Sequence, residues 1–169
     1  MGRGTTRAAP GIDADWDDAA ASLIISSHAT LEGALLPIFH ALQDRFGYID
    51  QKVVPQIAEA LNLSRAEVHG TLTFYHDFRT EPAGRHVVKL CRAESCQSMG
   101  CESLVDHLRA SHGIDMGATT ADGRLTVETV YCLGNCALSP AALVDGDLVG
   151  RLDKTRLDGL VHDLTGGRA

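Results

Sequence analysis

Two cysteine pairs constrain this chain of 169 residues more than any other feature of its sequence. The first pair is separated by four residues and the second by three, and the four cysteines are Cys91, Cys96, Cys132 and Cys136. Each pair directly follows a segment that predicts a β-strand, over residues 86–90 and 125–131. Strands of one sheet can bring their end loops together, so we expect the four thiols to meet at a sheet edge. Thiolates are soft ligands that select zinc, copper(I) or iron–sulfur clusters.

The cysteine spacing leaves several kinds of centre open. Structural zinc sites favour Cys-x2-Cys pairs, which are tighter than the gaps found here. A [2Fe–2S] cluster is larger and takes two thiolates on each iron, so it suits wider pairs. A thioredoxin-type disulfide enzyme needs Cys-x-x-Cys, which does not occur in this sequence. Spacing alone favours a [2Fe–2S] cluster over zinc, and disulfides or free thiols stay open.

Residues close to the first pair add two expectations. A fifth cysteine, Cys101, falls in the first turn of the helix expected after the loop. We interpret it as a small, partly buried residue facing the sheet, rather than as a substitute ligand or a reactive thiol. Glu94 and Glu102 flank the loop. Their negative charge should disfavour reduction of a bound cluster and so predicts a low midpoint potential.

The first half of the chain predicts helices. Apolar residues recur at helical spacing between Leu31 and Phe46, with Gly47 as the expected stop. A capping box at residues 64–67 predicts a further helix start. Pro37 and Pro55 fall inside these patterns, so each is expected either to begin a helical turn or to kink the helix.

A turn-rich segment at residues 80–84 marks the change to a mixed pattern. Further strands are expected over residues 141–144 and 148–149, joined by an Asp-Gly hairpin turn, and helices over 100–112 and 153–164. The expected class is therefore α+β, with a small mixed sheet covered by helices. We expect a flexible tail over residues 1–13, a helical bundle domain over 14–80 and an α/β domain over 81–169.

Composition and charge argue against two classes of function, nucleic-acid binding and membrane insertion. A formal net charge of −7 argues against a nucleic-acid partner, and no apolar run approaches the length of a membrane span. With no secretory pattern, we expect a reducing, cytoplasmic setting, where clustered cysteines indicate a metal centre.

No catalytic triad or carboxylate pair flanks the cysteine loops, so no catalytic residues are expected. His69 and His76, expected on one helix, are interpreted as solvated or interfacial. The aromatic run at residues 73–75 is interpreted as packing between the halves, with partner binding as the alternative.

These features together carry a family resemblance. The segments that carry it are residues 36–49, residues 58–68, Thr73-Phe-Tyr75, both cysteine pairs and Cys132-Leu-Gly-Asn-Cys136-Ala-Leu-Ser-Pro140. In this order they resemble the small thioredoxin-like [2Fe–2S] ferredoxin subunit of complex I and its relatives in NAD-dependent formate dehydrogenases and NAD-linked hydrogenases. The resemblance covers residues 30–163, nearly the whole chain.

The resemblance implies a thioredoxin-like domain that holds one [2Fe–2S] cluster. Its ligands would be Cys91, Cys96, Cys132 and Cys136, and its partner a flavin- and NAD-binding subunit. It further implies a non-catalytic electron-transfer subunit of an NAD-dependent oxidoreductase complex. Respiratory members typically read Cys-Thr-Gly-Thr-Ala-Cys in the first loop, whereas residues 91–100 read Cys-Arg-Ala-Glu-Ser-Cys-Gln-Ser-Met-Gly. This version looks more like the gamma subunit of formate dehydrogenase. Cys101 replaces a residue that is usually small in this family, which leaves the ligand set intact.

Overall fold

A computed structural model describes residues 16–166, and the tail expected over residues 1–13 lies outside this range. Within the described residues the chain divides into two compact units, one ending at Pro82 and the other beginning at Ala83. No helix in residues 16–166 has the length and apolar character needed to cross a membrane.

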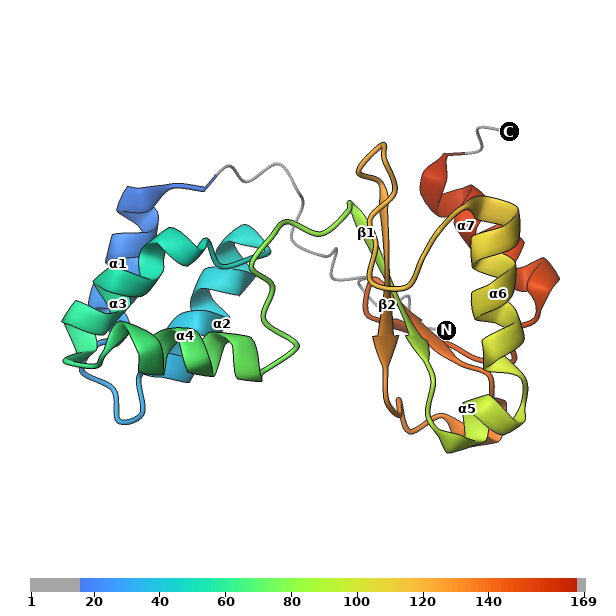
Figure 1. Ribbon diagram of the computed structural model, residues 1–169, viewed down its shortest axis with the longest axis horizontal. Helices are drawn as coiled ribbons and strands as arrows, with labels where there is room; N and C mark the ends of the chain where they lie inside the picture. Colours follow the sequence, from blue (N-terminus) through green and yellow to red (C-terminus); the bar gives the residue numbers. More distant parts are fainter. Residues whose placement is uncertain (1–15, 167–169) are drawn as a thin grey trace, which may run out of the picture. The chain divides into compact units, whose positions relative to one another are not determined.

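The first unit is a bundle of short helices (Figure 1). Its elements are α1 (Asp18–His28), α2 (Leu35–Phe46), a 3-10 turn η1 (Gln51–Val53), α3 (Val54–Leu61) and α4 (Arg65–Phe74). Each α-helix contributes buried apolar side chains to a shared core, including Ile25, Phe39, Leu42, Ile57 and Leu72. Burial of these faces supplies the hydrophobic stabilisation that such short helices lack in isolation.

Local sequence signals set the ends of these helices. Ser64 and Glu67 form the expected capping box at the start of α4, with each side chain accepting a backbone N–H bond from the other residue. Pro37 and Pro55 both lie in the first turn of their helices, where proline removes no helical hydrogen bond. Neither proline therefore has to kink its helix. Leu31 does not belong to the apolar face of α2, because it precedes the helix and is exposed.

The second unit is a four-stranded mixed sheet with helices. Its strands are β1 (His86–Cys91), β2 (Leu125–Val130), β3 (Ala142–Val144) and β4 (Asp147–Val149), and its helices are α5 (Glu94–Ser98), α6 (Cys101–His112) and α7 (Lys154–Thr165). The strand order is β2-β1-β3-β4. β1 pairs in parallel with β2 and antiparallel with β3, and β3 pairs antiparallel with β4. The expected α+β class, with a small mixed sheet, is confirmed; α5 is a short helix that the pattern did not predict.

The core of this unit lies between the sheet and the two long helices. α6 and α7 lie side by side next to the sheet (Figure 1). Val88 and Leu90 of β1 alternate toward this core together with residues of β2, α6 and α7, namely Leu125, Val127, Leu104, Leu108, Leu157 and Val161. The two-residue loop Asp145-Gly146 joins β3 to β4, as expected, and both residues have positive φ.

The pairing of β1 with β2 positions the two cysteine loops. The strands run parallel, with His86 opposite Leu125 and Cys91 opposite Val130. Parallel neighbours end at the same edge of a sheet, so the segments that leave both strands begin side by side. This edge and α5 lie at the bottom of the second unit in Figure 1.

Candidate metal centre

The four paired cysteines all lie at this edge, but in unequal environments. Cys91 is the last residue of β1 and Cys96 lies in α5; both are buried, with 3% exposure each. Cys132 follows β2 and Cys136 begins the 3-10 turn η2 (Cys136–Leu138); both are exposed. The first pair therefore faces the protein interior and the second pair faces solvent.

Hydrogen bonds tie the two cysteine loops together. The hydroxyl oxygens of Ser95 and Ser139 lie 2.8 Å apart. Ser139 Oγ donates to the Cys136 carbonyl at 2.8 Å, and Ser95 Oγ reaches the same carbonyl at 3.3 Å. The Cys91 amide donates to the Ala141 carbonyl at 3.0 Å. The convergence expected from two strand ends is thus present, and two serines that the sequence did not single out maintain it.

The second loop directs backbone N–H groups at the first cysteine. Cys132 has φ 77° and Gly134 has φ 72°, so the backbone turns twice through the left-handed region. Successive amides in such turns form a concave cradle for negative charge. Burial opposes ionisation of Cys91, but N–H groups of Ala93, Cys132 and Leu133 and the Cys96 thiol outweigh it, so its pKa is lowered. A non-glycine residue in this conformation is uncommon, and such residues occur often, though not exclusively, at functional sites.

Cys96 lies beside Cys91 in a less polar setting. Burial raises the pKa of its thiol, and Ser139 Oγ lies 3.7 Å from its sulfur. The two first-loop thiols interact directly, and protonation of one affects the other. Two thiols that interact directly in this way are a suitable pair of ligands for one metal atom.

Cys101 is completely buried at the start of α6. It packs with Cys91, Cys96 and Ala141 in a small apolar cluster. Burial, reinforced by the Glu102 charge, raises the pKa of Cys101 to about 11, so it stays a neutral thiol at physiological pH. Its position is more buried than expected, and it acts as packing beneath the first loop.

The charges around the first loop differ from their sequence interpretation. Glu102 forms a bidentate ion pair with Arg92, with distances of 2.9 Å to Nε and 2.7 Å to Nη2. The hydrogen bond from Arg92 holds the pKa of Glu102 below its usual range. Arg92 therefore balances the charge of Glu102, whereas Glu94 is exposed. Of the two acids that flank the loop, Glu94 carries the charge without this guanidinium partner.

Large apolar side chains lie exposed near the exposed cysteines in sequence. Tyr131 precedes Cys132 and is 75% exposed, and Leu138 ends the turn that Cys136 begins and is 38% exposed. Met99, at the end of α5, is 61% exposed. Apolar exposure of this kind beside a candidate site is typical of a surface that a partner covers.

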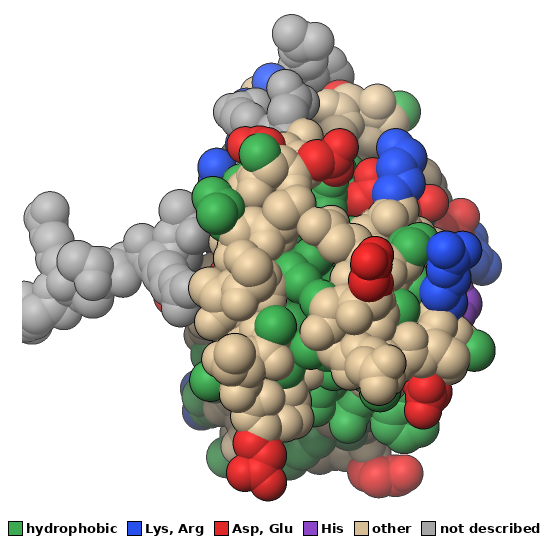
Figure 2. Space-filling model, turned by 90° about the vertical axis from the view of Figure 1, so that its left-hand side faces the viewer, with side chains coloured by type: hydrophobic (Ala, Val, Ile, Leu, Met, Phe, Trp, Pro, Cys, Tyr) green, Lys and Arg blue, Asp and Glu red, His purple; other side chains and the backbone are tan. Residues whose placement is uncertain are grey.

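The helical unit has exposed aromatic side chains of its own. Phe74 is 72% exposed and Tyr75 44% exposed, and both line a shallow hollow with Leu35 and Leu63. Figure 2 shows hydrophobic side chains reaching the surface of this unit between polar and acidic ones. The expectation that His69 and His76 share a helix is wrong for His76, because α4 ends at Phe74. Both histidines are exposed, in agreement with a solvated role.

Comparisons with known proteins extend these observations. The family model of the thioredoxin-like [2Fe–2S] ferredoxin matches residues 21–165. A subunit of the NADH-quinone oxidoreductase of Rhizobium meliloti (strain 1021) is 40% identical over 129 residues, 76% of this chain and 77% of the relative. The NADP-reducing hydrogenase subunit HndA of Solidesulfovibrio fructosivorans is 31% identical, over 76% of this chain and 75% of the relative.

The fold of this chain also matches part of a solved structure. The crystal structure of an NAD+-reducing [NiFe]-hydrogenase in the air-oxidised state matches 80% of this chain with a TM-score of 0.64 and 30% identity. This chain spans only 23% of the hydrogenase chain that it matches.

Proposed function

Because this chain belongs to the thioredoxin-like [2Fe–2S] ferredoxin family, we propose that it is a one-electron carrier subunit that works beside a flavin- and NAD-binding subunit. Cysteine spacing left open whether the centre is a [2Fe–2S] cluster or zinc. Membership of this family identifies it as a [2Fe–2S] cluster, because that is the family's cofactor. When bound, such a cluster supplies one-electron chemistry, which complements the hydride chemistry of flavin and nicotinamide.

We propose Cys91, Cys96, Cys132 and Cys136 as the cluster ligands. The single observation that carries this assignment is the convergence of the two loops, with second-loop amides directed at the Cys91 thiol. Four thiols are the donor set that a [2Fe–2S] cluster requires. A single zinc ion would need its sulfurs within about 4 Å of one another. Among the described residues no three cysteine sulfurs lie within 4.8 Å of each other, so the thiols do not form a compact single-ion zinc site.

The protein around these thiols has two tasks in this proposal. Backbone N–H groups stabilise negative charge on sulfur and so adjust the potential of the centre. The buried first pair shields one side of the centre, while the exposed second pair brings the other side to the surface. Tyr131 and Leu138 give this surface an apolar character that suits a protein partner.

The proposal also names the multisubunit complex to which this chain belongs. The first-loop sequence of residues 91–100 supports an NAD-dependent formate dehydrogenase, with this chain as its gamma subunit. The 40% identity to a component of NADH-quinone oxidoreductase supports complex I as the second candidate, and the hydrogenase matches support a third. A cytoplasmic location also belongs to the proposal, and the five free thiols suit a reducing compartment.

Anaerobic purification of the full chain tests the carrier function. We expect a red-brown protein with about two irons and about two inorganic sulfides per chain, which bleaches with dithionite and then gives the electron paramagnetic resonance signal of a reduced cluster. Colourless protein with one zinc and no sulfide would contradict the proposal. Co-purification from the native host then identifies the complex: a molybdenum-containing formate-oxidising subunit with a flavoprotein supports formate dehydrogenase, whereas quinone-reductase subunits identify complex I.

The charge next to the first loop should affect the midpoint potential. Glu94→Gln removes a negative charge, so reduction becomes easier and the midpoint should rise, by an amount on the order of 20 mV. Arg92→Gln removes the partner of Glu102 and should lower the midpoint. An anaerobic redox titration of the two variants measures both shifts. Equal shifts of the same sign in both variants would show that local charge does not set the potential.

A further inference from the structure

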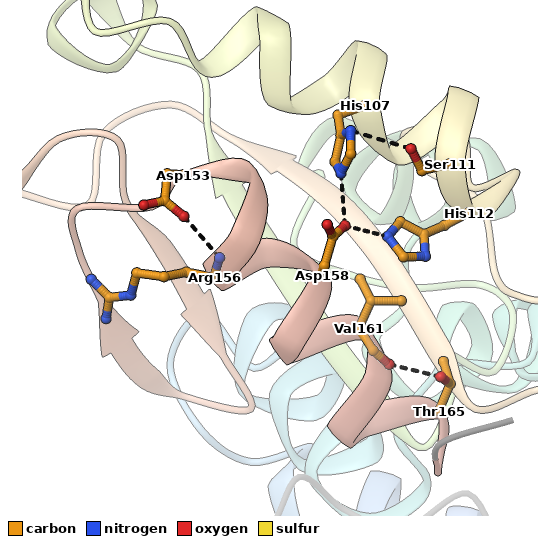
Figure 3. Close-up of polar contacts among 8 residues, drawn as sticks. All are labelled: His107, Ser111, His112, Asp153, Arg156, Asp158, Val161 and Thr165. Atoms are coloured by element: carbon orange, nitrogen blue, oxygen red, sulfur yellow. Dashed lines mark hydrogen bonds and ion pairs between the residues drawn. The ribbon is translucent and has the colours of Figure 1, made fainter. Parts of the chain in front are cut away.

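Two histidines and one aspartate meet away from the cysteine loops, where side chains of α6 and α7 come together. His107 lies in the middle of α6, His112 is its last residue, and Asp158 lies in the second turn of α7. Figure 3 shows both imidazole rings directed at the carboxylate of Asp158. His107 Nε2 and His112 Nε2 each lie 2.7 Å from Asp158 Oδ1.

We propose that His107, His112 and Asp158 form a second metal site, which binds a divalent transition ion such as zinc. Among the described residues this is the one group of three histidine, cysteine, aspartate or glutamate side chains whose ligand atoms all lie within 4.8 Å of one another. Tetrahedral zinc places its ligand atoms about 3.3 Å apart, given metal–ligand distances of about 2.0–2.1 Å. Small side-chain movements would therefore admit an ion.

The donor chemistry fits this class of metal. Imidazole nitrogen and carboxylate oxygen are zinc ligands, and two histidines with one carboxylate leave a fourth position for water or a partner group. The hydrogen bonds from His112 and His107 hold the pKa of Asp158 below its usual range, so the carboxylate stays negative. The exposed fractions of the His107, His112 and Asp158 side chains are 18%, 24% and 45%, which leaves the group accessible to an ion from solvent.

A fourth residue prepares His107 for this role. Ser111 Oγ lies 3.2 Å from His107 Nδ1, one helical turn further along α6. When His107 is neutral with its proton on Nδ1, it can donate to Ser111 and present a free lone pair on Nε2. Metal-bound histidines commonly donate their second ring N–H to such a partner, which fixes the tautomer and the ring orientation. Without an ion the same ring donates from Nε2 to Asp158 instead.

Such an ion would link the two helices that cover the sheet. His107 and His112 come from α6, and Asp158 comes from α7, 46 residues beyond His112. The site is proposed to bind its ion structurally, by joining α6 to α7, independently of the electron-transfer function.

Zinc titration of the full chain, purified anaerobically with its cluster, tests the proposal. Zinc bound after dialysis is measured by metal analysis, and the visible spectrum checks that the cluster is unchanged. We expect one zinc per chain and a rise in thermal stability with zinc. His112→Gln and Asp158→Asn should each weaken zinc binding at least tenfold, and Ser111→Ala, which removes only the outer partner, about tenfold.

His162→Gln is the matched control, because His162 is an exposed histidine in the last turn of α7 outside this group. It should leave zinc binding unchanged. His107→Gln keeps a side-chain N–H that can reach Asp158, so it separates a structural hydrogen bond from a ligand. Folded His107→Gln protein that no longer binds zinc supports the site. A wild-type chain that takes up no zinc at sub-millimolar concentration, or equal uptake by His112→Gln and wild type, overturns it.

Discussion

Replacing any one of Cys91, Cys96, Cys132 and Cys136 by alanine should remove nearly all of the iron and inorganic sulfide from anaerobically purified protein. A [2Fe–2S] cluster uses four thiolates, so three leave one iron with an incomplete ligand set. Alanine is preferred to serine because a serine hydroxyl can replace a thiolate as a weak ligand. Iron and sulfide analysis with the visible spectrum of each variant measures the effect.

Cys101→Ala provides the matched control for this series. Cys101 is the most buried cysteine, yet it is not among the proposed ligands. Its removal leaves only a small cavity in the cluster of buried residues beneath the first loop, so the variant should keep its full iron and sulfide content. Loss of the cluster in Cys101→Ala together with retention in one of the other four variants would show that the ligand set is assigned wrongly.

Gly150→Val should damage the metal centre from outside the cysteine loops. A Cβ atom at Gly150 would lie 2.6 Å from Leu138 Cβ and 2.8 Å from both Asn135 Nδ2 and the Leu138 carbonyl oxygen. These residues flank Cys136, so a larger side chain must displace the turn that holds this proposed ligand. Overpacking of this kind costs about 1–3 kcal/mol of stability, and the variant should also lose its cluster to a chelator several-fold faster.

Substitutions at two further glycines distinguish a loss of fold stability from a displacement of Cys136, the proposed ligand. A Cβ at Gly84 would lie 2.9 Å from the Leu125 backbone, at the opposite end of β2 from the cysteine loops. Gly84→Val should therefore destabilise the fold to a similar degree, with little effect on chelator resistance of the folded protein. A Cβ at Gly159 in α7 would meet no atom within 4 Å, so Gly159→Ala should be neutral or stabilising by up to about 1 kcal/mol. Denaturant titration and chelator kinetics of the three variants distinguish these outcomes.

Local patterns predicted much of the fold because their signals lie within a few residues. The capping box at Ser64, the Asp145-Gly146 hairpin and the two strands before the cysteine loops were all anticipated from neighbouring residues, although β1 ends one residue later and β2 one residue earlier than expected. The end of α4 was not, since nothing in the pattern near Phe74 marks the stop before His76. Short-range patterns identify where elements exist better than where they end.

Contacts between distant segments were beyond the sequence pattern. Ser95 and Ser139 meet only because β1 and β2 end at one edge, and they stand 44 positions apart. His107 and His112 are five positions apart, which is not the three or four that places two ligands on one helix face. Their common partner Asp158 belongs to another helix, so the group becomes visible only when α6 and α7 are packed together.

The unequal exposure of the four thiols bears on how the protein acquires and keeps its cofactor. With these four thiols as the proposed ligands, iron and sulfide would enter or leave most readily past Cys132 and Cys136, because Cys91 and Cys96 are closed off by the fold. A partner seated over the second loop would shut this entrance. Maturation of the subunit would then have to precede its assembly, and oxygen damage would fall mainly on chains still waiting for a complex.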